Sequence, residues 1–316
     1  MKSNEFYIFE YNSKESVKKY NRILMMLFQI PLLLFILFMI FYPIVVDVLK
    51  KKPLPYNNPW LFLIIYPVLI GISGIISTIV HELGHVFFGI ITGKSFYDMT
   101  FLVFTIEYSK QTKKFHFYYD DSYLKDFVAV GKATMVDKNN KYNPFNNIIY
   151  YLGGAIFNIL AWILLFIFQG NSILSLMMLY SGLSALIPFR YISTTGGFDG
   201  YLIISTLFSP KAREMYKMQH EVAKYLFAGV KLTADEIFKI SEYLIHSPYL
   251  NNQCLAYFLL AEFYLDNRCF EKATYYVDEI KEMKKILLKG EAFWYNEDEI
   301  KRLEDNILHD KSAFEQ

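Results

Sequence analysis

Two histidines and a glutamate in the segment "HELGH", residues 81–85, have the types and the spacing of a zinc site. In a helix His81 and His85 lie four positions apart on one face, so both imidazoles can bind one ion. Glu82 is turned by about 100° from His81 and can reach a water molecule beside that ion without binding the ion. Zinc lowers the pKa of bound water to about 7, and a carboxylate can accept the proton. The motif therefore predicts metal-dependent hydrolysis and requires a third ligand elsewhere.

The surroundings of this motif are apolar, which matters for its interpretation. No charged residue occurs from Trp60 to Val80, and the apolar character resumes after the motif and continues through Ile91. The alternative is that His81 and His85 are isolated polar residues on a buried helix. Ionisable residues within a membrane span are costly, and they usually mark a functional site. The context therefore favours a metal site over that alternative.

Few groups elsewhere in the apolar part of the chain can complete such a site. Asp47 ends the first apolar run beside three lysines, as an interfacial charge would, and Asn158 is neutral. Asp199 lies in "GGFDG", at a break between two apolar runs. Irregular backbone is tolerated at membrane depth only where it lines a cavity, and flanking glycines let a carboxylate approach an ion closely. We therefore expect Asp199 to be the third ligand.

Four apolar runs predict a polytopic, α-helical membrane protein with about four transmembrane helices, because a crossing needs about 20 apolar residues. A polar N-terminal segment, 1–22, precedes the first span, 23–49. The run that begins at Trp60 is longer than one crossing and must tilt, bend at Pro67 or emerge into a protein-lined cavity. The third and fourth runs, 147–168 and 173–189, are joined by only four residues.

Two further regions have other patterns. The loop 93–146 is polar overall but contains "MTFLVFTIEYS" and "KKFHFYYD", whose alternation is typical of strands. Residues 211–316 are charged and predict an all-α soluble domain. Within it, 255–280 resembles one tetratricopeptide hairpin, although a single hairpin does not distinguish that repeat from a plain helical bundle.

Composition and charge limit the partners and the orientation. The formal net charge is only +1, which argues against nucleic acid as a partner, because that requires a concentrated basic face. The N-terminal segment has five basic residues and the 93–146 loop has eight lysines, against Lys50, Lys51 and Lys52 in the first connection. The positive-inside rule then places the N-terminus, the loop and the C-terminal domain in the cytoplasm, although the three lysines oppose this.

Three segments together resemble the site-2 proteases, which are intramembrane zinc metalloproteases. That family has HExxH in one membrane helix, a G-x-x-x-N type element in a later helix and an Asp-Gly pair in another. The chain has "HELGH" (81–85), "GGAIFN" (153–158) and "GFDG" (197–200) in that order, each in an apolar context. The resemblance covers roughly residues 60–210 and is to a Gram-positive type without a PDZ domain.

The resemblance implies roles for five residues and a setting in the bacterial cell membrane. His81, His85 and Asp199 would bind one catalytic zinc ion, Glu82 would be the base, and Asn158 would assist at the scissile carbonyl. The strand-like loop would match a membrane-associated element that presents the substrate as an extended strand. One departure concerns Asp199, because Pro188 stands eleven residues before it and the usual Pro-x-Leu-Asp-Gly lead is absent.

Several functional alternatives remain open at the level of sequence. The expected substrate is a transmembrane or signal-like peptide: a membrane-anchored regulator, a signal-peptide remnant or a peptide precursor. An inactive scaffold of the same fold could instead bind membrane peptides, and zinc content would distinguish it. A metal transporter would need several ligand sets along the spans, whereas the chain has one. The C-terminal helices are expected to bind a partner protein or to cap the cytoplasmic entrance.

Overall fold

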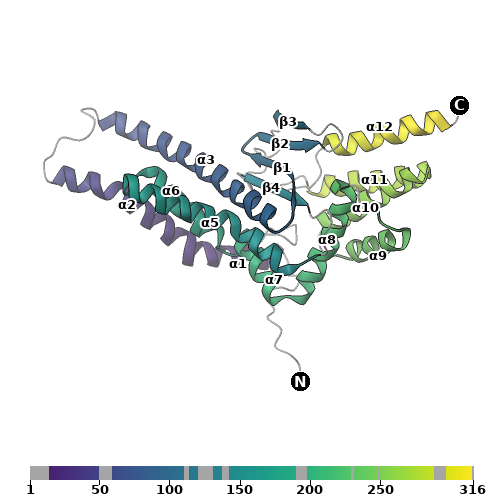
Figure 1. Cartoon of the computed structure of the whole chain (residues 1–316), viewed down its shortest axis with the longest axis horizontal. Coiled ribbons are helices and arrows are strands. Elements are labelled where there is room, and N and C mark those ends of the chain that lie inside the picture. The colour runs from purple at the N-terminus through teal and green to yellow at the C-terminus, as the bar shows by residue number, and fades with distance from the viewer. Residues whose placement is uncertain are drawn as a thin grey trace, which may run out of the picture.

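The computed structural model describes residues 14–49, 59–109, 114–119, 131–136, 142–189, 198–228, 231–247, 250–287 and 297–314. These residues are mostly helical, and three of their helices are long and apolar enough to cross a membrane. Figure 1 shows the apolar helices gathered at one end of the molecule and the C-terminal helices at the other. A small sheet lies between them.

A long helical run begins the described chain. Helix α1 (Lys14–Leu24) continues through a π-helical turn (Met25–Gln29) into α2 (Ile30–Leu49). The apolar part of this run, Val17–Tyr42, is the first candidate membrane span. The predicted first span, 23–49, lies within the run, but the helix starts earlier, inside the polar segment expected at 1–22. Residues 1–13 and 50–58 of the predicted segments lie outside the described residues.

Helix α3 (Pro59–Ile91) carries the HELGH motif near its C-terminal end. It has 33 residues and includes the second candidate span, Ile64–Ile91. At about 1.5 Å per residue the helix is about 50 Å long, which exceeds the thickness of about 30 Å of a bilayer core. Pro67 is accommodated inside it. The helix therefore continues beyond one crossing, and the motif lies in its last third.

Helices α5 (Pro144–Gln169) and α6 (Ile173–Ala185) form an antiparallel hairpin. Asn143 caps α5 by accepting a hydrogen bond from the Phe145 amide, and Pro144 occupies the first helical position, where a missing N–H costs nothing. Helix α5 is the third candidate span, whereas α6 has only 13 residues. It ends ahead of Pro188, consistent with the steric limits before proline. Four full crossings therefore stay a prediction.

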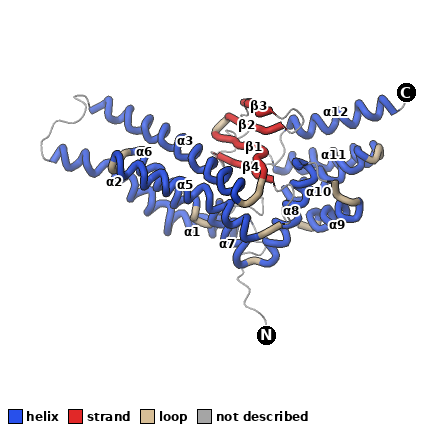
Figure 2. Tube along the Cα trace, in the orientation of Figure 1, coloured by secondary structure: helices blue, strands red, loops and turns tan. Residues whose placement is uncertain are grey.

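The sheet is antiparallel, with strand order β3-β2-β1-β4. Its strands are β1 (Ser95–Phe101), β2 (Phe104–Ser109), β3 (Lys114–Tyr119) and β4 (Gly131–Val136). The two strand-like runs of the sequence correspond to β1–β2 and β3, while β4 was not predicted. Figure 2 shows the strands grouped beside the C-terminal end of α3. There a Cβ atom added at Gly89 would lie 2.8 Å from Cε of Met135, so β4 packs directly on α3.

From Asp199 onwards every described regular element is a helix. These helices are α7 (Asp199–Phe208), α8 (Pro210–Ala228), α9 (Ala234–Ile245), α10 (Leu250–Asp266), α11 (Phe270–Leu287) and α12 (Glu297–Phe314). Helix α10 is shared by two buried clusters. One includes Val222 of α8 and Leu244 of α9, and the other joins α11 and α12.

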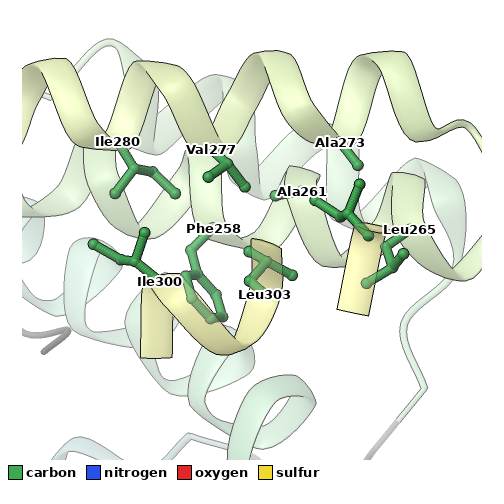
Figure 3. Close-up of a cluster of buried hydrophobic side chains, with 9 residues drawn as sticks. Phe258, Ala261, Leu265, Ala273, Val277, Ile280, Ile300 and Leu303 are labelled. Carbon is green, nitrogen blue, oxygen red and sulfur yellow. The ribbon is translucent and has the colours of Figure 1, made fainter. Parts of the chain in front are cut away.

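The second of these clusters is drawn in Figure 3. Phe258 and Ala261 of α10 face Val277 of α11 and Leu303 of α12, and all four are at most 3% exposed. The run 255–280 thus forms two adjacent antiparallel helices, α10 and α11, with further helices packed on both sides. Its assignment as a tetratricopeptide unit stays a prediction.

Candidate metal centre

His81 and His85 face the same space from one side of α3. Their Nε2 atoms are 3.2 Å apart, and the two rings meet edge to face with centroids separated by 4.8 Å. One turn of helix produces this arrangement, because positions i and i+4 lie above one another. Two ring nitrogens at this distance can share only one proton. The pair therefore suits a shared cation better than two isolated imidazoles.

Asp199 completes the group from the first turn of α7. Its Oδ2 atom lies 3.0 Å from Nε2 of His81 and 3.3 Å from Nε2 of His85, across 118 residues of sequence in the first case. The ligand atoms of the three residues all lie within 4.8 Å of one another. Two imidazoles and one carboxylate are a donor set that fits zinc and leaves a coordination position open. The three residues could hold a metal ion.

The backbone carbonyl of Tyr150 on α5 orients His85. It lies 2.8 Å from Nδ1 of His85, so this nitrogen donates its proton to the carbonyl and leaves the Nε2 lone pair directed at the candidate ion. Histidines that bind metals usually have such a partner on the second nitrogen, which fixes the tautomer and the ring. The chemistry of His85 thus depends on α5 as well as on α3.

Asn158, two turns further along α5, lies beside the second nitrogen of His81. Its Nδ2 atom is 3.4 Å from Nδ1 of His81 and donates a hydrogen bond to Oγ of Ser181 at 2.8 Å. The residue is fully buried, and its Oδ1 atom has no hydrogen-bond partner within the described parts of the chain. The structure therefore brings Asn158 to the histidine pair.

Glu82 is separate from the three converging residues. It is 5% exposed and faces β4, whose Ala133 backbone forms a hydrogen bond with its carboxylate. A Cβ atom at Gly131 would lie 2.6 Å from Oε1 of Glu82, so the start of β4 covers this carboxylate. Tyr150 also reaches β4, by donating from its hydroxyl to the Ala133 carbonyl at 2.5 Å.

Glycines bring the helices of the site close together. A Cβ atom at Gly84 would lie 2.4 Å from the carbonyl oxygen of Gly153, and one at Gly154 would lie 2.5 Å from the ring of His81. Next to Asp199, a Cβ atom at Gly200 would lie 2.0 Å from the carbonyl oxygen of Leu186. Each glycine therefore allows an approach between elements that any side chain would prevent. The glycine of the Asp-Gly pair lets α7 start against the end of α6.

Sequence reasoning named five site residues, and all five lie in this region. It missed three contributors: the Tyr150 carbonyl, Ser181 and the edge of β4. A backbone carbonyl leaves no signal in a sequence, and a lone serine in an apolar helix has no distinguishing pattern. Of the earlier candidates, the side chain of Asp47 and the lead-in 190–197 to Asp199 lie outside the described residues.

Comparison of the chain with protein-family models, curated proteins and solved structures returned no match.

Proposed function

We propose that the protein is an intramembrane zinc metalloprotease that hydrolyses peptide bonds of membrane-embedded substrates, as its resemblance to site-2 proteases implies. The observation that carries the proposal is the convergence of His81, His85 and Asp199 beside Glu82. The two histidines belong to a helix with the length and composition of a membrane span, and Asp199 begins a short apolar helix. Hydrolytic chemistry would thus be available next to lipid-embedded peptides.

The metal and the base have separate tasks in this proposal. Zinc held by two imidazoles and one carboxylate would supply a Lewis acid for the scissile carbonyl and would acidify water. Glu82 would accept the proton of the attacking water and return it to the leaving amine. This assignment agrees with the position of Glu82 in the site, next to the ligands but outside the converging group.

The edge of β4 that faces away from β1 would position the substrate. Among the described strands β4 pairs only with β1, and its other edge directs the N–H and the C=O of Ala133 towards Glu82 and Tyr150. An extended peptide could add to the remaining main-chain groups of this edge through hydrogen bonds. The substrate would be a transmembrane or signal-like peptide whose cleaved segment has unwound, because a helix hides its carbonyls from attack.

The remaining expectations concern location and partners. Three membrane-length helices support an integral membrane protein. We propose the bacterial cell membrane, with the N-terminus, the sheet and helices α8–α12 in the cytoplasm, in accordance with the lysine distribution. The C-terminal helices would bind a partner protein or cap the entrance to the site.

The Glu82→Gln variant tests the enzymatic assignment. Loss of the base should abolish cleavage while the three ligands still bind zinc. Membrane peptides from cells that express the wild type or the variant should therefore differ in cleaved fragments, as measured by quantitative mass spectrometry. Purified samples of both should contain one zinc ion per chain.

The matched control is Glu107→Gln, which changes a glutamate on β2, paired with His116 of β3, and should leave the fragments unchanged. Fragments that persist in the Glu82→Gln cells would contradict the assignment of Glu82 as the base. A wild-type protein without zinc would contradict the metalloprotease proposal as a whole.

A further inference from the structure

His81 uses one of its ring nitrogens for the candidate ion and has the other beside α5. Its Nε2 atom lies 3.0 Å from Asp199, and its Nδ1 atom lies 3.4 Å from the side-chain nitrogen of Asn158. When Nε2 supplies its lone pair to a metal, the ring proton must be on Nδ1. The group that faces Nδ1 must then be a hydrogen-bond acceptor, and an amide NH2 group cannot accept.

The amide of Asn158 can meet this requirement by exchanging its two ends. The oxygen and the nitrogen of a side-chain amide have nearly the same shape, and their partners determine the orientation. In the orientation with Nδ2 beside His81, Oδ1 has no hydrogen-bond partner within the described residues, so the exchange of the two ends breaks no hydrogen bond at that end. In the reversed orientation Oδ1 takes the place of Nδ2 and can accept a hydrogen bond from Nδ1–H of His81.

Ser181 on α6 makes this reversed orientation stable. Its Oγ atom is 2.8 Å from the amide position that also faces His81. A serine hydroxyl can either accept from an amide NH2 group or donate to an amide oxygen. With Oδ1 in this position, the carbonyl would accept two hydrogen bonds, one from Nδ1 of His81 and one from Ser181. The hydroxyl therefore supports the orientation that zinc binding requires.

We infer that Asn158 and Ser181 are positioning residues for the metal: Ser181 holds the Asn158 carbonyl against Nδ1–H of His81 and thereby directs Nε2 at the ion. This inference rests on the proposed zinc site. In this arrangement the Asn158 carbonyl would orient His81 in the way that the Tyr150 carbonyl orients His85. The arrangement also leaves the Asn158 NH2 group without a hydrogen-bond partner among the described residues, so this group would be the one to donate to a substrate carbonyl that enters the site.

The two ends of Asn158 can be tested separately through zinc affinity. The full-length protein in detergent would be titrated with zinc against a chromophoric chelator. We expect Asn158→Ala to weaken zinc binding by about 10–100-fold, the usual loss when a partner of a metal-bound histidine is removed, and Ser181→Ala by about tenfold. Asn158→Asp keeps an acceptor for His81 and should bind zinc at least as tightly as the wild type, yet it lacks the NH2 donor and should not cleave.

Cobalt substitution supplies a spectroscopic readout. The visible absorption of bound Co2+ depends on ligand geometry, so Ser181→Ala should shift the bands while the melting temperature of the metal-free protein stays unchanged. Ser184→Ala is the matched control, since Ser184 lies on the same helix and its hydroxyl donates to the Ser181 carbonyl rather than to Asn158. It should alter neither the affinity nor the spectrum.

The outcomes separate this inference from the proposed function. A wild-type protein that binds no zinc would remove the proposed function and the inference with it. A wild type that binds zinc while Ser181→Ala and Asn158→Ala bind it equally well would overturn the inference alone. Equal losses in Asn158→Asp and Asn158→Ala would also overturn it, because an acceptor would then not suffice.

Discussion

At the scale of single residues, Gly154 sets how closely α5 can approach the imidazole of His81. A Cβ atom at this position would lie 2.5 Å from Cε1 and from Nε2 of the ring. The ring cannot easily move away, because Asp199 lies at one of its nitrogens and Asn158 at the other. The absence of a side chain at residue 154 is therefore part of the ligand geometry.

Replacement of Gly154 by alanine should impair metal binding. The added methyl group forces the His81 ring out of line with His85 and Asp199, so zinc affinity should fall at least about tenfold, as for other changes that misorient a ligand. Chelator competition with the purified protein would measure this. Gly71→Ala is the control, because nothing lies within 4 Å of a Cβ atom there. Unchanged zinc affinity in Gly154→Ala would show that the ring is not confined in this way.

At the scale of elements, the contact between α3 and α5 is made by backbone. Gly84 and Gly153 oppose each other, and a Cβ atom on either would lie within 2.6 Å of the carbonyl oxygen of the other. Small residues at such a crossing allow the close packing on which helix association in a membrane depends. This crossing also brings Tyr150 and Asn158 of α5 to the two histidines.

A Gly84→Ala substitution should therefore separate the helices and destabilise the fold. Because backbone atoms cannot rotate away, the cost should be about 1–3 kcal/mol, as for other overpacked sites. The melting temperature of the protein in detergent with a chelator present would report this without any contribution from metal. Gly74→Ala is the matched control, since its Cβ atom would make only an ordinary contact of 3.7 Å with Met177. Equal melting temperatures would refute a tight crossing at Gly84.

The elements also show how far sequence reasoning reached. Uncharged runs identified the long helices, because a continuous apolar stretch of about 20 residues is typical of a membrane-spanning helix. The alternation around Ile106 and Phe117 identified β2 and β3. The strand β4, "GKATMV", was missed because it is short and begins with glycine and lysine, which are poor strand formers. Its position depends on packing against Gly89 and Glu82, which are distant in sequence.

The residues of the candidate site that could be predicted are those recognisable by their side-chain type. The groups that contribute only through their position in the fold could not be predicted. His81, Glu82 and His85 follow from one motif. Asp199 was expected from the break between two apolar runs, with which the resemblance agreed, and its ligand atom does lie with those of the histidines. The Tyr150 carbonyl could belong to any residue type. Ser181 belongs to the candidate site because its Oγ atom contacts Asn158, and no sequence pattern shows that contact.

At the scale of the whole molecule, the C-terminal helices form a unit with its own buried clusters, and Glu262 lies partly buried within it. Burial raises the pKa of this carboxyl group above its ordinary value, although the charge of Arg302 opposes the shift. A raised pKa means that the folded state prefers the protonated form. The contribution of the protonated carboxyl group to folding stability is therefore complete below the ordinary carboxyl pKa. It is lost as the pH rises through the higher pKa of the folded state.

Glu262→Gln should therefore stabilise the protein at neutral pH. The neutral amide avoids the cost of burying a charge, so the melting temperature at pH 7 should rise by a few degrees. Near pH 4 the wild-type carboxyl group is largely protonated in the folded state, and the advantage should shrink. Glu242→Gln, at an exposed position of α9, should change little at either pH. A lower melting temperature for Glu262→Gln at pH 7 would mean that attraction to Arg302 outweighs burial.

In the proposed metal site, the dependence of both histidines on α5 would couple metal occupancy to the packing of the helices. The ligands come from α3 and α7, the Tyr150 carbonyl and Asn158 from α5, and Ser181 from α6, so no single inserted helix offers the site. If packing of these helices raises the metal affinity tenfold, bound metal stabilises the packed state by about 1.4 kcal/mol relative to the unpacked helices. A chain whose helices have entered the membrane without packing would be chemically inert. Under the proposed function, hydrolytic activity would therefore arise only after these helices have packed together.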